Sequence, residues 1–102
     1  MSAAGRADPM TARFVDVLVT LQPGEVVSYG DVAEIAGYPR RSRAVGHLLA
    51  TTDIEVPWWR VVRADGRLAT QPPREQAALL RAEGVTLRGD RVIESPGGRF
   101  RR

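Results

Sequence analysis

Apolar residues near the beginning of the chain recur with the spacing of a helix. Four of them stand at i, i+3, i+4 and i+7 and share one helical face: Phe14, Val17, Leu18 and Leu21. Asp8 and Pro9 predict where this helix begins, because aspartate caps free helical amides and proline tolerates the first helical position. Pro23-Gly24 predicts the turn that ends it.

Two shorter helical patterns follow, separated by a glycine. Ser28 and Asp31, three residues apart, predict a capping box at the start of the first of them, and Gly37 ends it. Its inner face is expected to carry Val32, Ile35 and Ala36. The next helix is expected to run from Pro39 to about Ala50, with three residues facing inward: Val45, Leu48 and Leu49. Two short helices around a glycine turn predict a helix-turn-helix unit.

Short β patterns lie between and after these helices. Val26-Val27 predicts a very short strand, and residues 58–63 are partly β-like. Asp65-Gly66 is a favourable hairpin turn, from which Leu68 is expected to begin a return strand that resembles the wing of a winged helix. A second small hairpin is expected within residues 85–93.

A final helix and two tails complete the predicted organisation. Pro72-Pro73 breaks the chain before a helix over 74–83. We expect one domain over residues 8–94, with flexible tails at 1–7 and 95–102. The predicted fold class is mainly α with a small β hairpin, of the winged helix-turn-helix type.

Composition narrows the class of protein. A chain of 102 residues, 43% hydrophobic and 26% charged, suits one small soluble domain. No apolar run approaches a membrane span of ~20 residues, so we expect a cytoplasmic protein without a membrane partner. All 15 basic residues are arginine, whose planar guanidinium binds phosphate with two parallel hydrogen bonds. The chain has no cysteine, and no acidic or histidine cluster has metal-ligand spacing, so we expect neither metal nor cofactor.

The most informative segment is Pro57-Trp58-Trp59-Arg60-Val61-Val62. It resembles the active-site motif of the O6-alkylguanine-DNA alkyltransferases, Pro-Xaa-Xaa-Arg-Val-Val. In that family the first Xaa is the alkyl-accepting cysteine and the second is a histidine that helps to activate it. Both are tryptophan here. The chain thus resembles the alkyltransferase-like proteins, non-catalytic relatives that commonly carry tryptophan at the cysteine position, and we expect no enzymatic activity.

A second block strengthens the resemblance. The segment Ser28-Tyr29-Gly30 and the segment 40–46 are similar to the first helix and the recognition helix of the transferases. Positive side chains at a helix N-terminus also suit phosphate on physical grounds. The resemblance implies that Arg43 fills the gap left by an extruded nucleotide and that Tyr29 crowds the adjacent phosphate. The expected DNA-binding residues are Tyr29, Arg40, Arg41, Ser42, Arg43, Ala44 and Gly46.

The family's pocket carries over by position as well. The lesion pocket implied by the resemblance is lined by Tyr29, Leu49, Trp58, Val61, Leu68, Ala69 and Thr70. Trp58 is expected to be the pocket wall, Trp59 to pack or lie at an edge, and Arg60 to bridge carbonyls or acids. Glu83 matches the glutamate that supports the family histidine; with no histidine present, we expect it only to add polarity to the last turn of its helix.

The resemblance predicts a DNA-binding protein of unusual kind. It would bind duplex DNA in the minor groove as a monomer and flip O6-alkylguanine into the Trp58 pocket without transferring the alkyl group. The bound lesion would then be marked for nucleotide excision repair proteins, and in the cytoplasm the protein would associate with the nucleoid.

Three alternatives remain on the sequence alone. A winged-helix regulator would bind DNA without base flipping, and an enzyme would transfer the alkyl group to a residue other than cysteine. A structural protein-interaction domain would show no salt-dependent affinity for DNA at all.

Overall fold

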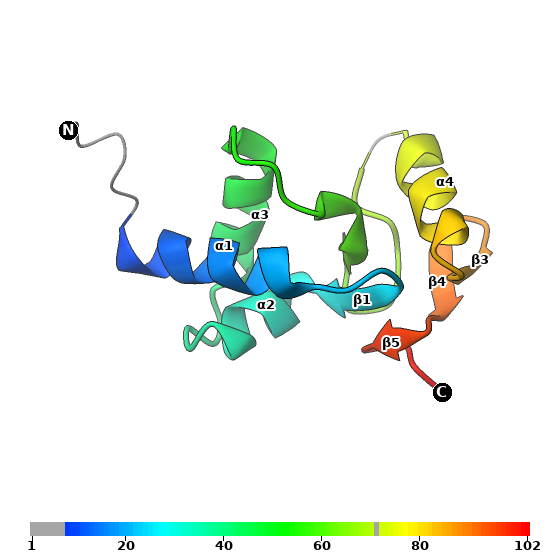
Figure 1. Ribbon diagram of the computed structural model, residues 1–102, viewed down its shortest axis with the longest axis horizontal. Coiled ribbons are helices and arrows are strands. Elements are labelled where there is room, and N and C mark those ends of the chain that lie inside the picture. Colours follow the sequence, from blue (N-terminus) through cyan, green and yellow to red (C-terminus); the bar gives the residue numbers. More distant parts are fainter. Residues whose placement is uncertain (1–7, 71) are drawn as a thin grey trace.

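The structure is a computed structural model that describes residues 8–70 and 72–102 (Figure 1). Helices α1 to α3 gather at one end, α4 with β3 and β4 lies at the other, and β1 lies between them. In chain order the elements are α1 (Pro9–Thr20), β1 (Glu25–Ser28), α2 (Tyr29–Ile35), α3 (Ser42–Thr51), the 3₁₀ turn η2 (Trp58–Arg60), β2 (Val61–Val62), α4 (Arg74–Ala82), β3 (Thr86–Arg88), β4 (Arg91–Glu94) and β5 (Gly97–Gly98).

The predicted start of α1 is confirmed. The Asp8 carboxylate accepts hydrogen bonds from the amide and hydroxyl of Thr11 at 2.9 and 3.0 Å, and Pro9 is the first helical residue. Phe14 and Leu18 are fully buried, so the inward face of the helix follows the spacing read from the sequence.

The helix-turn-helix unit forms with two differences from prediction. The capping box is present, with Ser28 and Asp31 each accepting the other's amide at 3.0 Å. The inward assignment of Ile35 is wrong, because its side chain is 64% exposed and Ala33 is buried in its place. Helix α3 begins at Ser42 rather than Pro39, because Arg40 adopts a left-handed φ of 70° that no α-helix continues.

The predicted wing hairpin, with residues 58–63 paired to a return strand that begins at Leu68, is wrong. Strand β2 pairs in parallel with β1, with Val61 opposite Val27 and Val62 opposite Ser28. Both valines are buried, which suits a strand covered on both faces. The turn at Asp65-Gly66 does form, but the Leu68 amide then donates to the carbonyl of Asp90 at 2.8 Å. The second predicted hairpin is confirmed as β3 and β4.

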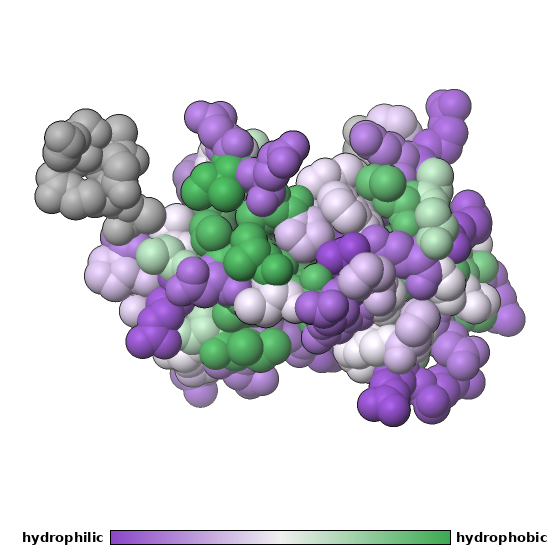
Figure 2. Space-filling model, viewed as in Figure 1, coloured by the Kyte–Doolittle hydropathy of each residue, from purple (hydrophilic) through white to green (hydrophobic). Residues whose placement is uncertain are grey.

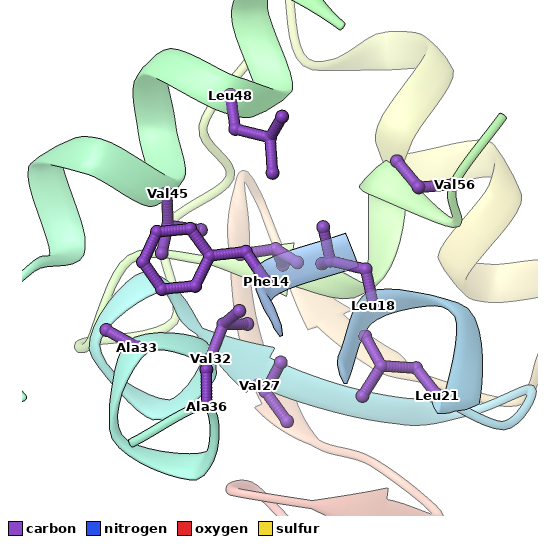
Figure 3. Close-up of a cluster of buried hydrophobic side chains, with 11 residues drawn as sticks. Phe14, Leu18, Leu21, Val27, Val32, Ala33, Ala36, Val45, Leu48 and Val56 are labelled. Carbon is purple, nitrogen blue, oxygen red and sulfur yellow. The ribbon is translucent and has the colours of Figure 1, made fainter. Parts of the chain in front are cut away.

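Two hydrophobic clusters meet at β1. The first cluster joins α1, α2 and α3 around Phe14, Leu18 and Val45 (Figure 3). The second cluster joins β2, α4 and β4, and Leu80 lies at its centre with no exposed surface. Successive side chains of a strand point to opposite faces, so Val27 of β1 enters the first cluster and Val26 enters the second.

The segment after Glu94 belongs to the folded unit. We expected residues 95–102 to be a flexible tail, but β5 pairs in parallel with β1 and the amide of Arg99 donates to the carbonyl of Val26 at 2.8 Å. Ser95 is buried. The expected tail at 1–7 lies outside the described residues. Among the described helices, none has the length and apolar character needed to span a membrane.

Replacement of Gly98 by alanine tests whether this last strand is docked. Gly98 has φ of +83°, and a Cβ there would press into the backbone of Val26. We expect Gly98→Ala to lower the free energy of unfolding by about 2–5 kcal/mol in urea titrations. Gly89→Ala is the matched control, because Gly89 also has positive φ but no atom lies within 4 Å of its added Cβ. It should cost only about 1 kcal/mol. Equal effects would show that the 95–100 segment is not packed on β1.

Candidate nucleic-acid interface

A cavity of about 830 Å³ opens between the helix-turn-helix unit and the start of α4. Six of the seven residues expected to line a lesion pocket lie around it: Tyr29, Leu49, Trp58, Val61, Ala69 and Thr70. The assignment of Leu68 is wrong. Its side chain is 4% exposed and packs in the second cluster, because the neighbouring residue Ala69 takes the position facing the cavity.

The wall formed by α4 was missed from the sequence. Ala50, Pro72, Arg74, Glu75 and Gln76 also line the cavity, together with Gly46, which we expected to contact DNA. The available signal was the helical spacing of Gln76, Ala77 and Leu80, which places an amide on the buried side of α4.

The Gln76 side chain connects two segments beside the cavity, residues 59–61 and residues 69–70. Its side-chain amide donates to the carbonyls of Trp59 and Val61 at 3.1 and 3.0 Å. Its carbonyl oxygen accepts from the amides of Ala69 and Thr70 at 3.1 and 3.4 Å, and from the Thr70 hydroxyl at 3.2 Å. A buried amide with all its groups bonded fixes its surroundings in one arrangement. The shape of the cavity therefore depends on a residue that contributes little surface to it.

The two adjacent tryptophans separate into different environments. Trp58 is half-buried, packs against the first cluster and lines the cavity. Trp58 also lines a smaller hollow bordered by Val19 and Ile54, so its side chain is accessible from the surface. Trp59 packs against the second cluster, and the two rings meet edge to face with centroids 5.9 Å apart.

Glu83 has a larger role than the sequence indicated. Its carboxylate accepts hydrogen bonds from the Gly24 amide at 2.8 Å, from the Trp59 indole at 2.8 Å and from the Arg60 guanidinium at 2.6 Å. The expectation of mere polarity in a last helical turn is therefore wrong, because the indole N–H donates to Glu83 in the absence of a histidine. Arg60 also donates to the Leu21 carbonyl at 2.8 Å, which confirms its expected bridging role.

This network changes the acidity of Glu83. Burial alone would raise the pKa of the carboxyl group, whose side chain is only 14% exposed. The hydrogen bonds from Arg60, Gly24 and Trp59, with the charge of Arg60, outweigh burial and lower the pKa from 4.5 to about 2. Glu83 is therefore ionised at neutral pH and binds its donors as a carboxylate.

The expected DNA-binding residues gather at the N-terminal end of α3. Arg40, Arg41, Ser42 and Arg43 are exposed, whereas Ala44 and Gly46 are half-buried. Gly46 lies against the ring of Tyr29, where an added Cβ would stand 3.8 Å from the nearest ring atom. Tyr29 and Gly46 also line the cavity, so the basic helix end and the cavity adjoin.

The described residues offer no obvious metal site. Within 8–70 and 72–102, no three His, Cys, Asp or Glu side chains are grouped so that they could hold a metal ion.

Comparisons with known proteins agree with this geometry. The sequence model described as "6-O-methylguanine DNA methyltransferase, DNA binding domain" matches residues 9–85. A DNA base-flipping protein of Escherichia coli K12 is 36% identical over 94 residues, which cover 87% of this chain and 72% of that protein.

Solved structures show the same likeness. Schizosaccharomyces pombe Atl1, in complex with damaged DNA containing O6-carboxymethylguanine, matches with a TM-score of 0.71 and 27% identity, over 81% of this chain and 82% of that chain. Mycobacterium tuberculosis OGT in complex with DNA matches with a TM-score of 0.66 and 35% identity, over 76% and 51% of the two chains. These likenesses confirm the helix-turn-helix-like fold class.

Acid titration tests the carboxylate network. Because the pKa of Glu83 is depressed in the folded state, its contribution to stability is complete above about pH 5 and is lost as the pH falls towards 2. The shift corresponds to roughly 3 kcal/mol. Glu83→Gln should be less stable than the wild type by about this amount at pH 7, and the difference should shrink by pH 3 in urea unfolding. Glu75→Gln, an exposed carboxylate of α4, is the control and should change neither value. A pH-independent deficit in Glu83→Gln would contradict the assignment.

Proposed function

The chain belongs to the family of 6-O-methylguanine DNA methyltransferase DNA-binding domains, and we propose that it binds duplex DNA through the minor groove and flips O6-alkylguanine into the cavity beside Trp58. The alkyl group is bound there and not transferred. By holding the lesion, the protein marks it for nucleotide excision repair. It acts as a monomer in the cytoplasm, associated with the nucleoid when bound to DNA.

The observation that carries this proposal is that the basic N-terminal end of α3 lies next to the cavity that contains Trp58. Tyr29 and Gly46 line this cavity and also line the surface beside Ser42 and Arg43. A base that leaves the duplex near α3 is therefore adjacent to the cavity. Extrusion costs a few kcal/mol, and less for a damaged pair, so the protein selects bases whose pairing is already weakened.

The lack of transfer chemistry follows from the residues at the motif. Alkyl transfer in this family needs a thiolate, and the chain has no cysteine. Trp58 stands at the position of the acceptor and offers an aromatic ring with a single N–H donor. Trp59 stands at the position of the activating histidine, and its indole N–H donates to Glu83. In this proposal, the Trp58 ring provides a surface on which a flipped base stacks, at the position where the transferases carry their nucleophile.

Two features of relatives support lesion recognition. The Escherichia coli relative is called a DNA base-flipping protein, and the solved Atl1 complex contains O6-carboxymethylguanine in DNA. The second candidate, a DNA-binding regulator without flipping, is favoured only by the exposed arginines of the α3 end, which suit plain phosphate contact.

Lesion preference is measured with paired duplexes that differ by one O6-methyl group. We expect the lesion duplex to bind at least about tenfold more tightly in fluorescence anisotropy at moderate salt, because stacking on an aromatic ring contributes ~1–3 kcal/mol. A 2-aminopurine placed opposite or beside the lesion should brighten as the base leaves the stack. Equal affinity for the two duplexes would refute lesion recognition. Mass spectrometry of the protein after incubation should show no mass gain, and any stable gain would support the transferase alternative.

Arg43→Ala separates flipping from plain phosphate contact. If Arg43 fills the gap left by the extruded base, the variant should lose most of its preference for the lesion duplex while it retains binding to undamaged DNA. Arg81→Ala, in the last turn of α4, provides the control and should leave both affinities unchanged. A uniform loss on both duplexes would favour the regulator without flipping.

A further inference from the structure

A second hollow, of about 610 Å³, adjoins the cavity beside Trp58. Its lining residues come from α2, α3 and the segments after β2: Tyr29, Ser42, Arg43, Gly46, His47, Arg63 and Ala69. Tyr29, Gly46 and Ala69 line the cavity as well. A nucleotide whose base enters the cavity must keep its backbone outside, and this hollow lies directly at that mouth.

The lining of this hollow favours an anion. It contains two arginines and the hydroxyl-bearing Tyr29 and Ser42, with no carboxylate among its residues. The next hollow along the surface differs, because Asp31 and Glu34 line it. Of its arginines, Arg99 is already paired with Asp31 at 3.0 Å. An incoming phosphate therefore meets no carboxylate in the first hollow, whereas two carboxylates oppose its charge in the second.

Arg63 was not among the residues expected to bind DNA, yet it lines both hollows. Its backbone is fixed by the turn after β2, where its amide donates to the Arg67 carbonyl at 2.9 Å and its carbonyl accepts from Gly66 at 2.8 Å. Its side chain is exposed, and within residues 8–70 and 72–102 its guanidinium takes part in no ion pair. The backbone of Arg63 is therefore fixed, and its guanidinium N–H groups are available to bind an anion.

The charge of Arg63 also reaches Tyr29. Burial raises the pKa of the Tyr29 phenol, and the positive charge of Arg63 acts in the opposite direction. The two side chains are therefore electrostatic neighbours at the mouth of the cavity, which agrees with their shared hollows.

We propose that Arg63, with the Ser42 hydroxyl across the hollow, forms a phosphate-binding subsite that receives the DNA backbone beside the extruded nucleotide. Ser42 is the first residue of α3 and Arg63 follows β2, so the phosphodiester lies between elements on two sides of the hollow. A guanidinium donates two parallel hydrogen bonds to phosphate oxygens, which fixes orientation as well as attraction. The inference rests on the proposed function and adds a residue that the family motif does not identify.

The test compares Arg63→Ala with the wild type on duplexes with and without O6-methylguanine across a salt series. Loss of one phosphate contact lowers the slope of log K against log salt by about 0.9, which amounts to about eightfold weaker binding at 0.1 M salt. We expect this loss on both duplexes equally, because a phosphate contact carries no base information. Arg63→Lys should retain the salt slope, since the charge remains. Arg88→Ala, an exposed arginine of the β3–β4 hairpin, is the matched control and should bind as the wild type does.

The outcomes of this test separate the two proposals. If Arg63→Ala keeps the wild-type slope and affinity, as Arg88→Ala should, the subsite is refuted while lesion preference in the wild type still stands. A loss confined to the lesion duplex also overturns it, because Arg63 would then act on the extruded base. If the wild type binds both duplexes equally but Arg63→Ala still lowers the slope, lesion recognition fails and the subsite stands. Thermal melting monitored by circular dichroism should match the wild type, because the Arg63 side chain bonds to no described residue.

Discussion

The carboxylate of Glu83 is the interaction on which the geometry of the site most depends. It stands at the end of α4 and binds the Gly24 amide before β1, the Trp59 indole and the Arg60 guanidinium. Arg60 extends the connection to the carbonyl of Leu21, just after α1. One ionised group thereby links the helix-turn-helix end of the molecule to the α4 end. Breaking such a partly buried pair leaves an uncompensated charge, so the arrangement is costly to distort.

The cavity is lined from both halves of the molecule, by residues of α2 and α3 on one side and of α4 on the other. Alternate side chains of β1 pack into the two hydrophobic clusters. The two tryptophans are divided between the same clusters, because Trp58 packs against the first and Trp59 against the second. Gln76 then bonds the backbone on two sides of the opening. The backbone around the cavity is thereby held by hydrogen bonds, as expected of a largely pre-formed ligand site.

Recognition and chemistry are separable in this architecture. The residues that would position DNA lie on α2, α3 and the turn after β2, whereas the residues at the two chemical positions of the motif are Trp58 and Trp59. Both tryptophans contribute to the structure, because the Trp59 N–H supplies a donor to Glu83 and the Trp58 ring supplies surface to the cavity.

The sequence by itself determined what depends on neighbouring residues. The cap at Asp8, the capping box at Ser28, the turn glycines and most of the cavity lining were predicted, because short-range chemistry or a motif with fixed spacing specifies each of them. Only the tertiary structure decided the parallel pairing of β1 with β2 and β5, the burial of Leu68, the exposure of Ile35, the role of Gln76 and the place of Arg63. These features arise from segments that meet across dozens of residues, and a two-residue strand carries no local signal for the partner with which it will pair.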